Sequence, residues 1–501
     1  MLIKKNILLF IAIFTFFGCQ ENWDEYYEEH EPTVDQNMWE QISNDPRFSM
    51  FVEYAIDTGV DTFFQNGNAI TVFIPDNEAF TSFSTDTTDV EILMKYHFIQ
   101  TVVNIRNIGK ARKMETSGGK YALLENNDQE SYIDGVNITY SSPLFLNGKY
   151  YIIDKVLFPK PTLYEYISVI NPVLKDYIDE FDSVYLNINE STPIGYDESG
   201  NTIYDSVFTY INIFDSLYFP IQNEFRNRAA SMVIFDEEQY RNALTEMALN
   251  LGDGFNSYED IPKKWQYNVL LPELIDKRIF GEPLHYTDFE KEYLKNVSGD
   301  TVFMDQASID AESRFVCSNG ISFKYNEFYV ADSLYKGELK AQGESLVDLI
   351  GAGVFGFKEG VTITGTGQPP TKEFAGSADN DSLMNLELGI RYTDEMMLEF
   401  FIPDVLPQRY RLVWSANFRP SGLFEVYVND EMVGEIDLFN LRRTQVSVTG
   451  EFFVPVDGIN KIDFWVDNIE SYGNVKIGLK YIDTGLGNFN GISIDYISLI
   501  P

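Results

Sequence analysis

The sequence predicts a multidomain protein in which two α+β domains are followed by an all-β sandwich. Three observations carry this prediction. A short β-branched strand at 70–74 lies between helical patterns at 38–55 and 92–100. A similar but more divergent order of segments returns between residues 161 and 340. From about residue 345 the chain changes to short alternating strands separated by turns, and its 501 residues suit about three domains.

The first residues have the pattern of an export signal. Lys4 and Lys5 precede an apolar run at 7–17, and Gly18 stands directly before Cys19. This order is typical of a cleaved signal rather than a spanning helix. The ending Phe16-Phe17-Gly18-Cys19 resembles a bacterial lipobox, which implies that Cys19 is acylated and begins the mature protein. The alternatives are a plain secretory signal with an incidental cysteine and a short N-terminal anchor.

An acidic stretch follows the cysteine. We expect a signal peptide at 1–19, a tether at 20–35, α+β domains at 36–160 and 161–340, and the sandwich at 341–501. Acidic residues directly after a lipidated cysteine resemble the surface-export signal of Bacteroidota lipoproteins, so the chain is expected on the outer membrane, facing outward. The alternative is an ordinary charged linker.

The charge of the chain restricts its partners. With 37 Lys and Arg against 77 Asp and Glu, the formal net charge is −40. Nucleic acid is excluded, because phosphate binding needs clustered basic residues. Adsorption to anionic lipid is disfavoured for the same reason, so membrane contact is expected only through the lipid anchor. Acylation of Cys19 would leave Cys317 unpaired, and packing alone would then hold the domains.

The first α+β segment carries three ordered motif blocks. They are Thr71-Val72-Phe73-Ile74-Pro75-Asp76-Asn77 with the helix it opens, Tyr96-His97, and the closing block from Asn147-Gly148 through Asp154 to Pro159. Together they resemble the fasciclin (FAS1) family. The resemblance implies structural roles, chiefly packing and hydrogen bonding, for Thr71, Phe73, Asp76, Asn77, Tyr96, His97 and Asp154.

The second α+β segment resembles a divergent copy of the same domain. Met232 to Tyr240 parallels the first block without its proline, and Asn319-Gly320 opens a segment like the closing block. The helical stretch 265–279 lacks the tyrosine–histidine pair. An insertion between Asp182 and Ser216 has turn residues flanked by aromatics, which predicts an exposed hairpin.

The last third resembles galactose-binding-like jelly rolls, a fold that many carbohydrate-binding modules share. Strands are predicted at 398–403, 410–414, 461–466 and 492–501. A hairpin is predicted from 424–428 and 433–438 around the Asn429-Asp430 turn.

No catalytic set is recognised, so the chain is not expected to be an enzyme. Its three histidines, His30, His97 and His285, are placed in the tether, the fasciclin helix and a loop. No zinc spacing, phosphate-binding glycine loop or nucleophile elbow occurs. Paired carboxylates are too common in this acidic chain to indicate glycosidase chemistry.

Glycan-binding candidates lie at strand ends and loops of the sandwich. An exposed aromatic ring stacks on a pyranose, and polar side chains bind its hydroxyls. The candidates are Trp414, Asn417, Arg419, Tyr472 and Asn474, whereas Trp465, in mid-strand, is expected in the core. If an ion is bound, calcium is favoured, with Asp379 and Asp381 as ligands; the alternative is a hydrophilic turn.

The expected function is that of a cell-surface lipoprotein binding an extracellular polysaccharide or oligosaccharide. Its expected setting is a SusC/SusD-type polysaccharide uptake system, beside a TonB-dependent barrel and a SusD-like lipoprotein. The alternative is an adhesion or assembly protein whose fasciclin domains dock protein partners.

Overall fold

The computed structural model describes residues 33–65, 67–83, 89–127, 130–219, 221–224, 229–252, 254–375, 378–388, 395–417, 422–437, 452–453, 459–483 and 491–501. By its internal contacts the chain divides into two compact units, residues 1–234 with 276–326 and residues 235–275 with 327–501. This division passes through the predicted second domain, so the boundaries at 160 and 340 stay predictions. Cys19 and residues 20–32 of the predicted tether lie outside the described residues, whereas Thr33–Val34 forms strand β1.

Within the part of the chain that the structure describes, no helix is both long and apolar enough to cross a lipid bilayer.

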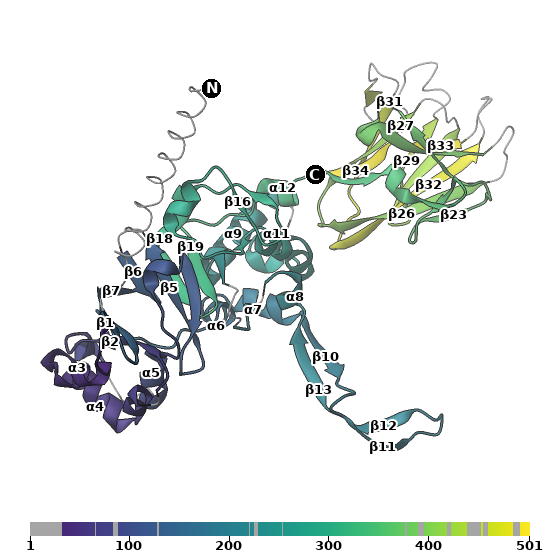
Figure 1. Cartoon of the computed structure of the whole chain (residues 1–501). Helices are drawn as coiled ribbons and strands as arrows, with labels where there is room; N and C mark the ends of the chain where they lie inside the picture. Colours follow the sequence, from purple (N-terminus) through teal and green to yellow (C-terminus); the bar gives the residue numbers. More distant parts are fainter. Residues whose placement is uncertain are drawn as a thin grey trace, which may run out of the picture. The chain divides into compact units, whose positions relative to one another are not determined.

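The first unit is built on a nine-stranded sheet (Figure 1). Its strand order is β1-β8-β9-β7-β6-β5-β4, and β2 pairs with β9 and β3. The strands are β1, β2 (Ile70–Pro75), β3 (Phe98–Ile99), β4 (Ala111–Glu115), β5 (Tyr121–Asn127), β6 (Glu130–Ile133), β7 (Val136–Ser141), β8 (Leu144–Phe145) and β9 (Gly148–Ile153). The helices that accompany this sheet are α3 (Met38–Asn44), α4 (Ser49–Asp57) and α5 (Val90–Tyr96).

Strand β2 is the centre of this domain because every one of its residues is buried. Ile70, Val72 and Ile74 pack in a core with side chains of α3, α4 and α5, whereas Phe73 packs in a second core with residues of β5, β6 and β9. Alternation along the strand thus sends successive side chains to opposite sides of the sheet. The helix predicted after β2 is only a single 3₁₀ turn, Ala79–Ser82.

A second sheet in the first unit repeats the pairing of the first. It consists of β15 (Ile279–Phe280), β14 (Ala230–Ile234), β19 (Gly320–Tyr325) and β18 (Ile309–Cys317) in that order. In the first sheet β2 runs parallel to β9 from the pair Ile70–Gly148, and in the second β14 runs parallel to β19 from the pair Ala230–Gly320. The short strand β3 pairs antiparallel with β2, beginning at Thr71, and β15 pairs antiparallel with β14, beginning at Ser231. Each of these pairings begins one residue after the start of the parallel pairing in its sheet.

Side-chain hydrogen bonds repeat as well. Thr71 Oγ1 donates to a backbone carbonyl in the loop after β3 (2.7 Å) and accepts from an amide there (2.8 Å). Ser231 Oγ makes the same two bonds after β15 (2.9 and 2.7 Å). Asn147 Oδ1 accepts from the first amide of α3 (2.9 Å), as Asn319 Oδ1 accepts from the first amide of α6, Leu163–Ile170 (2.8 Å). These shared contacts support the interpretation of the second segment as a divergent copy.

The insertion contains the predicted exposed hairpin, at residues 192–205, and a second antiparallel ribbon whose strands flank it in the sequence. Strand β10 (Asp182–Leu186) pairs with β13 (Phe208–Asn212), and β11 (Thr192–Tyr196) pairs with β12 (Thr202–Asp205). The ribbons follow α7 (Pro172–Asp179) and precede α8 (Phe214–Leu217). The first unit also contains the small pair β16 (Leu294–Lys295) and β17 (Thr301–Val302).

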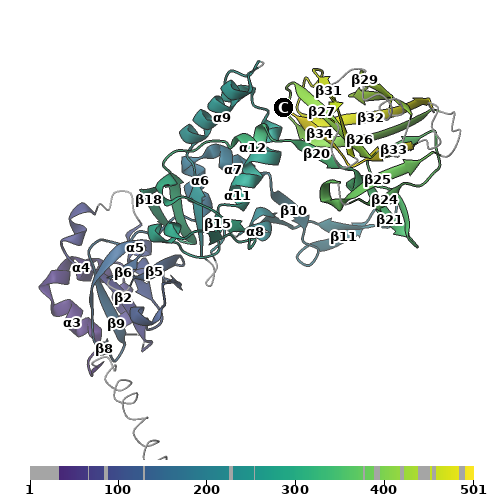
Figure 2. The same cartoon turned by 90° about the horizontal axis from the view of Figure 1, so that it is seen from above.

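The second unit contains helices and the sandwich. Its helices are α9 (Glu237–Leu251), α10 (Lys263–Trp265), α11 (Leu271–Asp276, of which the last residue belongs to the first unit) and α12 (Asp332–Tyr335). One sheet of the sandwich is β20 (Leu339–Gln342), β34 (Tyr496–Ile500), β27 (Tyr410–Asn417), β31 (Ile459–Val466) and β30 (Phe452–Phe453) (Figure 2). The other is β23 (Thr362–Thr364), β26 (Met396–Val405), β32 (Gly473–Asp483), β28 (Leu423–Val428) and β29 (Glu431–Asp437).

The sandwich has further small sheets and a large apolar core. β24 (Thr371–Phe374), β25 (Ser382–Glu387) and β33 (Gly491–Ile494) form one, and β21 (Val347–Gly351) and β22 (Val354–Phe357) form another. The predicted hairpin is confirmed as β28–β29, with positive φ at Asn429 (50°) and Asp430 (69°), as a primed turn requires. The fold class is therefore two fasciclin-like α+β domains followed by a jelly-roll sandwich.

His97 illustrates how the first domain is held. It is fully buried, its Nε2 accepts from the Leu157 amide (3.0 Å), and Nδ1 lies 2.9 Å from the Leu93 carbonyl. Because an amide donates to Nε2, the ring proton is on Nδ1 and the imidazole is neutral. Burial lowers the pKa of His97 to about 4, against a hydrogen-bonding contribution from Leu93 that raises it.

We expect His97→Gln to reduce the free energy of unfolding by about 1–2 kcal/mol above pH 7, because Gln cannot keep both bonds. The unfolded chain binds a proton at His97 near pH 6.5, but the folded protein only near pH 4. The wild type therefore loses about 3 kcal/mol of its free energy of unfolding as the pH falls through that window, and the variant does not. Urea titrations across this range should show the advantage of the wild type shrinking on acidification and then reversing, because the loss of about 3 kcal/mol exceeds the initial difference. A difference that is independent of pH would contradict a neutral buried imidazole.

Candidate functional site

Trp414 was expected to bind sugar, and the structure shows that this prediction is wrong. Its side chain is completely buried in the sandwich core, where it packs edge-on against Phe424 with ring centroids 5.6 Å apart. Its Nε1 donates to the Ser493 carbonyl (3.0 Å). The physical reason is that β27 continues to Asn417, so Trp414 lies inside the strand and faces inward rather than entering a loop.

Trp465 was expected in the core, and this prediction is also wrong. Its side chain is 58% exposed, although Phe464 and Val466 on either side of it are buried. Trp465 lies opposite Arg411 in the β27–β31 register, on the outer face of the sheet. The Arg409 guanidinium lies 4.2 Å from the centroid of the indole and forms an ion pair with Asp467 (2.8 Å), which fixes the ring by a cation–π contact.

A pocket of about 610 Å³ lies beside this exposed indole. It is formed by the β28–β29 turn and the segment after β31, and it is lined by Asn429, Glu431, Met432, Val433, Trp465, Asp467, Asn468, Glu470 and Ser471. The Asn468 amide donates to the Val428 carbonyl (2.9 Å) and to Glu431 Oε2 (3.1 Å). Among the described residues Asn468 Oδ1 has no hydrogen-bond partner. The pocket therefore combines one aromatic face with amide and carboxylate groups.

The other predicted sugar contacts lie outside the Trp465 pocket or outside the described residues. Tyr472 is half-buried, and its hydroxyl donates to Asp404 Oδ1. Asn474, two positions further along the chain on β32, has an exposed side chain. Neither Tyr472 nor Asn474 lines the Trp465 pocket. Asn417 ends β27, and its side chain lies outside the described part of the chain, as does all of Arg419.

The residues proposed for calcium do not fit that ion. Asp379 Oδ2 accepts from Lys340 Nζ and from Gln342 Nε2, both at 2.8 Å, so an ammonium group already neutralises it. Asp381 is exposed on the same short turn. Within the described ranges no three His, Cys, Asp or Glu side chains are grouped to hold a metal.

The fasciclin motif residues lie in and around the core of the first domain. Phe73 stacks on Tyr151 with ring centroids 5.5 Å apart. Asp76 Oδ1 accepts from the amide of Ala79 (2.9 Å). Asn77 joins the turn after β2 to helix α4: its Oδ1 accepts from the backbone amide of Met50, the second residue of α4 (3.1 Å).

Two further motif residues differ in their environment. The Tyr96 hydroxyl donates to Asp134 Oδ2 (2.7 Å), and burial raises the pKa of this aspartate to about 6. Asp154 has an exposed side chain, and its backbone amide donates to the Asn137 carbonyl (3.3 Å).

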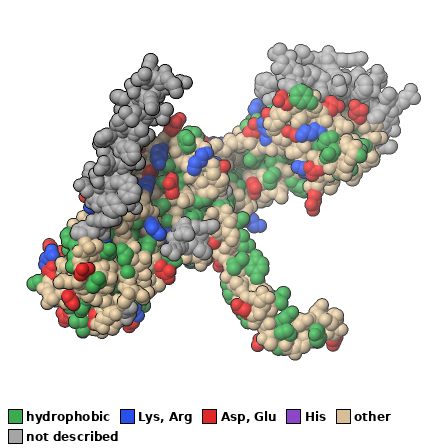
Figure 3. Space-filling model, in the orientation of Figure 1, with side chains coloured by type: hydrophobic (Ala, Val, Ile, Leu, Met, Phe, Trp, Pro, Cys, Tyr) green, Lys and Arg blue, Asp and Glu red, His purple; other side chains and the backbone are tan. Residues whose placement is uncertain are grey.

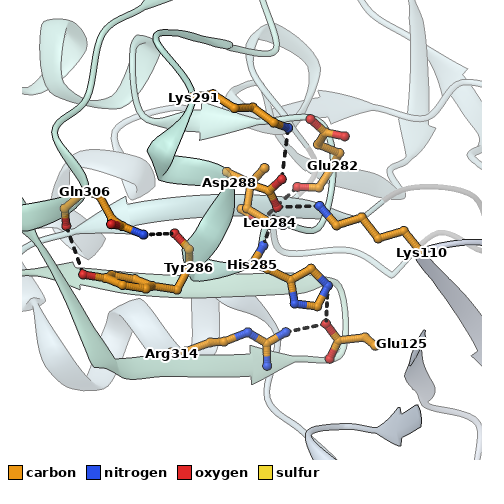
Figure 4. A network of polar contacts seen from close by, with 11 residues as sticks. Lys110, Glu125, Glu282, Leu284, His285, Tyr286, Asp288, Lys291, Gln306 and Arg314 are labelled. Carbon is orange, nitrogen blue, oxygen red and sulfur yellow. Dashed lines mark hydrogen bonds and ion pairs between the residues drawn. The ribbon is translucent and has the colours of Figure 1, made fainter. Parts of the chain in front are cut away.

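A second pocket, of about 860 Å³, lies in the first unit between the two α+β segments. Polar contacts among its lining residues join the two segments (Figure 4). Glu125 on β5 is 1% exposed and forms an ion pair with Arg314 on β18. His285 Nε2 lies 3.8 Å from Glu125 Oε1. Burial raises the pKa of Glu125, and Arg314 opposes that effect. Sequence reasoning missed this pair, because its members are 189 positions apart.

A neighbouring pair crosses the same junction. Lys110 contacts Asp288, which also accepts from Lys291 Nζ (3.0 Å) and from the His285 amide (2.7 Å). Burial would raise the pKa of Asp288, but these hydrogen bonds outweigh it and lower the pKa to about 2. Both carboxylates are thus neutralised by cations. This arrangement forms a latch between the two segments, because Glu125 and Lys110 of the first pair with Arg314 and Asp288 of the second.

Comparisons with known proteins agree with part of this picture. Residues 46–159 match the fasciclin domain family. A search of curated proteins found no match. Among solved structures, the chain is similar to a FAS1 domain pair from the insect cell adhesion molecule Fasciclin I, with 14% identity and a TM-score of 0.23, covering 57% of this chain and 98% of that one.

Two other solved structures are similar to parts of the chain. A family 35 carbohydrate binding module from Clostridium thermocellum has 13% identity and a TM-score of 0.21, covering 32% of this chain and 96% of that one. A Paenibacillus xanthan lyase has 14% identity and a TM-score of 0.22, covering 28% of this chain and 12% of that one. The family match confirms the resemblance predicted from the three motif blocks: residues 46–159 are fasciclin-like.

Proposed function

We propose that this chain is a non-enzymatic, lipid-anchored surface protein that binds a neutral extracellular glycan at the Trp465 pocket. The observation that carries the proposal is an indole that is 58% exposed, fixed by Arg409 and set at the edge of a pocket with hydrogen-bonding groups. A pyranose ring would stack on the indole, and its hydroxyls would bind Asn429 and Asp467.

The charge of the pocket favours a neutral glycan. Three carboxylates, Glu431, Asp467 and Glu470, line it, and Arg409 is engaged with one of them. A uronic acid or sulfated sugar would place like charges together, which opposes binding. The net charge of −40 on the whole chain also repels anionic sugars.

Trp465→Ala is expected to weaken polysaccharide binding about 30-fold or more, because a tryptophan that stacks on its ligand supplies a large share of the binding free energy. Affinity gels and isothermal titration with neutral polysaccharides, using the chain that begins at residue 20, would measure this. Phe374→Ala is the matched control, since Phe374 is an exposed aromatic of the same unit that does not line the pocket.

Unchanged affinity in Trp465→Ala would remove this pocket from the proposal. Failure of the wild type to bind any polysaccharide, combined with retention of a protein partner, would instead favour the alternative of an adhesion or assembly protein whose fasciclin domains dock protein.

The anchor and its setting are part of the same proposal. Acylation at Cys19 and the acidic residues after it would display the chain outward from the outer membrane, beside a TonB-dependent barrel and a SusD-like lipoprotein of a SusC/SusD-type system. Cys19→Ser is expected to abolish metabolic labelling with palmitate and retention in the membrane fraction. Labelling that persists in the variant would show that the cysteine is not the lipid attachment site.

A further inference from the structure

The two ribbons at residues 182–212, called here the arm, carry an unusual surface. Figures 1 and 3 show the arm as a thin projection, with hydrophobic side chains along it. Its exposed large apolar residues, each 40–77% exposed, are Val184, Tyr185, Leu186, Ile188, Ile194, Tyr196, Ile203, Val207, Phe208, Tyr210 and Ile211. Soluble proteins rarely leave contiguous apolar surface of this kind uncovered, and where they do it marks an interaction site.

The arm is built to hold its shape while exposed. At its tip Asp197 accepts from the amides of Ser199 (2.9 Å) and Asn201 (2.8 Å). Where the two ribbons meet, the Asn187 amide donates to the Val207 carbonyl (2.8 Å). A two-stranded ribbon without a covering layer is marginally stable in water, so a partner that covers the arm would stabilise it. Because the turns are already formed, binding would lose little conformational entropy.

The charge of the arm identifies the chemistry of the partner. Residues 182–212 contain five acidic residues, Asp182, Glu190, Asp197, Glu198 and Asp205, and no Lys or Arg. A second copy of this chain would bring two acidic arms together, and an anionic lipid surface would repel them. Strand β13, in contrast, carries no charged side chain, and in the described part of the chain it pairs only with β10. Its other edge can accept a strand from another protein.

We propose that the arm docks on a different protein, in an apolar groove whose rim carries Lys and Arg. The aromatic and aliphatic side chains of the arm fill the groove, and Glu198 and Asp205 face the basic rim. This surface is separate from the Trp465 pocket, so the docking proposal does not depend on glycan binding.

A photo-cross-linking residue placed at Tyr196 or at Tyr210 tests the proposal in the full-length chain, in cells that naturally produce it. Both positions are expected to give a light-dependent adduct with one other protein, whereas the control position Leu146, which is 71% exposed outside the arm, is not. The cross-linked peptide of that protein should be apolar and flanked by Lys or Arg. An adduct of two copies of this chain, an adduct with lipid, or no adduct from either arm position would overturn the proposal.

Charge reversal on the purified full chain and the captured protein provides the second measurement. Glu198→Lys with Asp205→Lys is expected to weaken their association about tenfold at low salt, and added salt should reduce the difference. The control, Glu53→Lys with Asp57→Lys, makes the same charge change on the exposed face of α4 and should leave the affinity unchanged. Equal affinity for the arm variant and wild type, or equal loss in both variants, would show that the acidic arm does not meet a basic rim.

Discussion

Gly148→Ala is expected to destabilise the first α+β domain by about 4 kcal/mol or more. Gly148 has a φ of +125°, and a Cβ placed there would lie 1.8 Å from the Ile70 carbonyl oxygen. The obstacle is backbone rather than a flexible side chain, and Ile70 and Gly148 are the first pair of the parallel β2–β9 ladder. The ladder would therefore have to shift to admit a methyl group. Urea denaturation of the variant would measure the loss, which could appear as a failure to fold.

Gly109→Ala is the matched control for this prediction. Gly109 also has a positive φ (+75°), but no heavy atom lies within 4 Å of a Cβ built there. Its substitution should therefore show backbone strain alone, about 1 kcal/mol. If Gly148→Ala and Gly109→Ala lost similar free energies of unfolding, the close approach of β2 to β9 would not be the reason for glycine at position 148.

Arg314→Met is expected to reduce the free energy of unfolding by about 3–5 kcal/mol at neutral pH, because it leaves the Glu125 carboxylate buried without its cation. Without Arg314 the pKa of Glu125, already raised by burial, would rise further. A raised pKa in the folded state means that the penalty is present at high pH and is relieved as the pH falls and the group takes up a proton. The loss should accordingly be smaller near pH 5 than near pH 7.5.

Two variants at the same junction make this prediction specific. Lys110→Met removes the cation from Asp288, but Lys110 is 44% exposed and Lys291 still pairs with Asp288, so a loss below about 1 kcal/mol is expected. Combining Arg314→Met with Glu125→Leu removes both charges and should recover much of the stability. An Arg314→Met loss that is no larger than that of Lys110→Met, or that is independent of pH, would exclude a buried ion pair as the latch.

The first domain could be predicted well because its three motif blocks stand in a recognisable order. Only Asp76 bonds within its own turn, whereas Thr71, Asn77 and His97 bond to backbone groups that are distant in the sequence, so it was the resemblance of the blocks and not a local contact that indicated the fold. The second copy was harder to recognise, because Ser231 replaces Thr71 and the tyrosine–histidine pair is missing. Its shared register and the Asn319 bond to α6 became visible only with the strands paired.

The binding site of the sandwich could not be predicted in this way. Both Trp414 and Trp465 lie in strands with apolar neighbours, and the burial predicted for each from the sequence was the reverse of what the structure shows. Which face of a strand is buried depends on its register and on the sheet packed against it, and a shift of one residue exchanges the two faces. The Arg409 contact that fixes Trp465 joins a residue directly before β27 to one on β31, so no local pattern reports it.

By itself the sequence determined the order of domain types, the fasciclin resemblance and the acidic character of the chain, because composition, periodicity and turn residues act over short stretches. Only the tertiary structure decided which tryptophan is exposed, that Glu125 meets Arg314, and that the insertion presents an uncovered apolar arm. Those features depend on which distant segments pack together and which remain without a covering layer. The burial of a side chain is set by the whole fold, and burial determines how much that side chain contributes to stability or to binding.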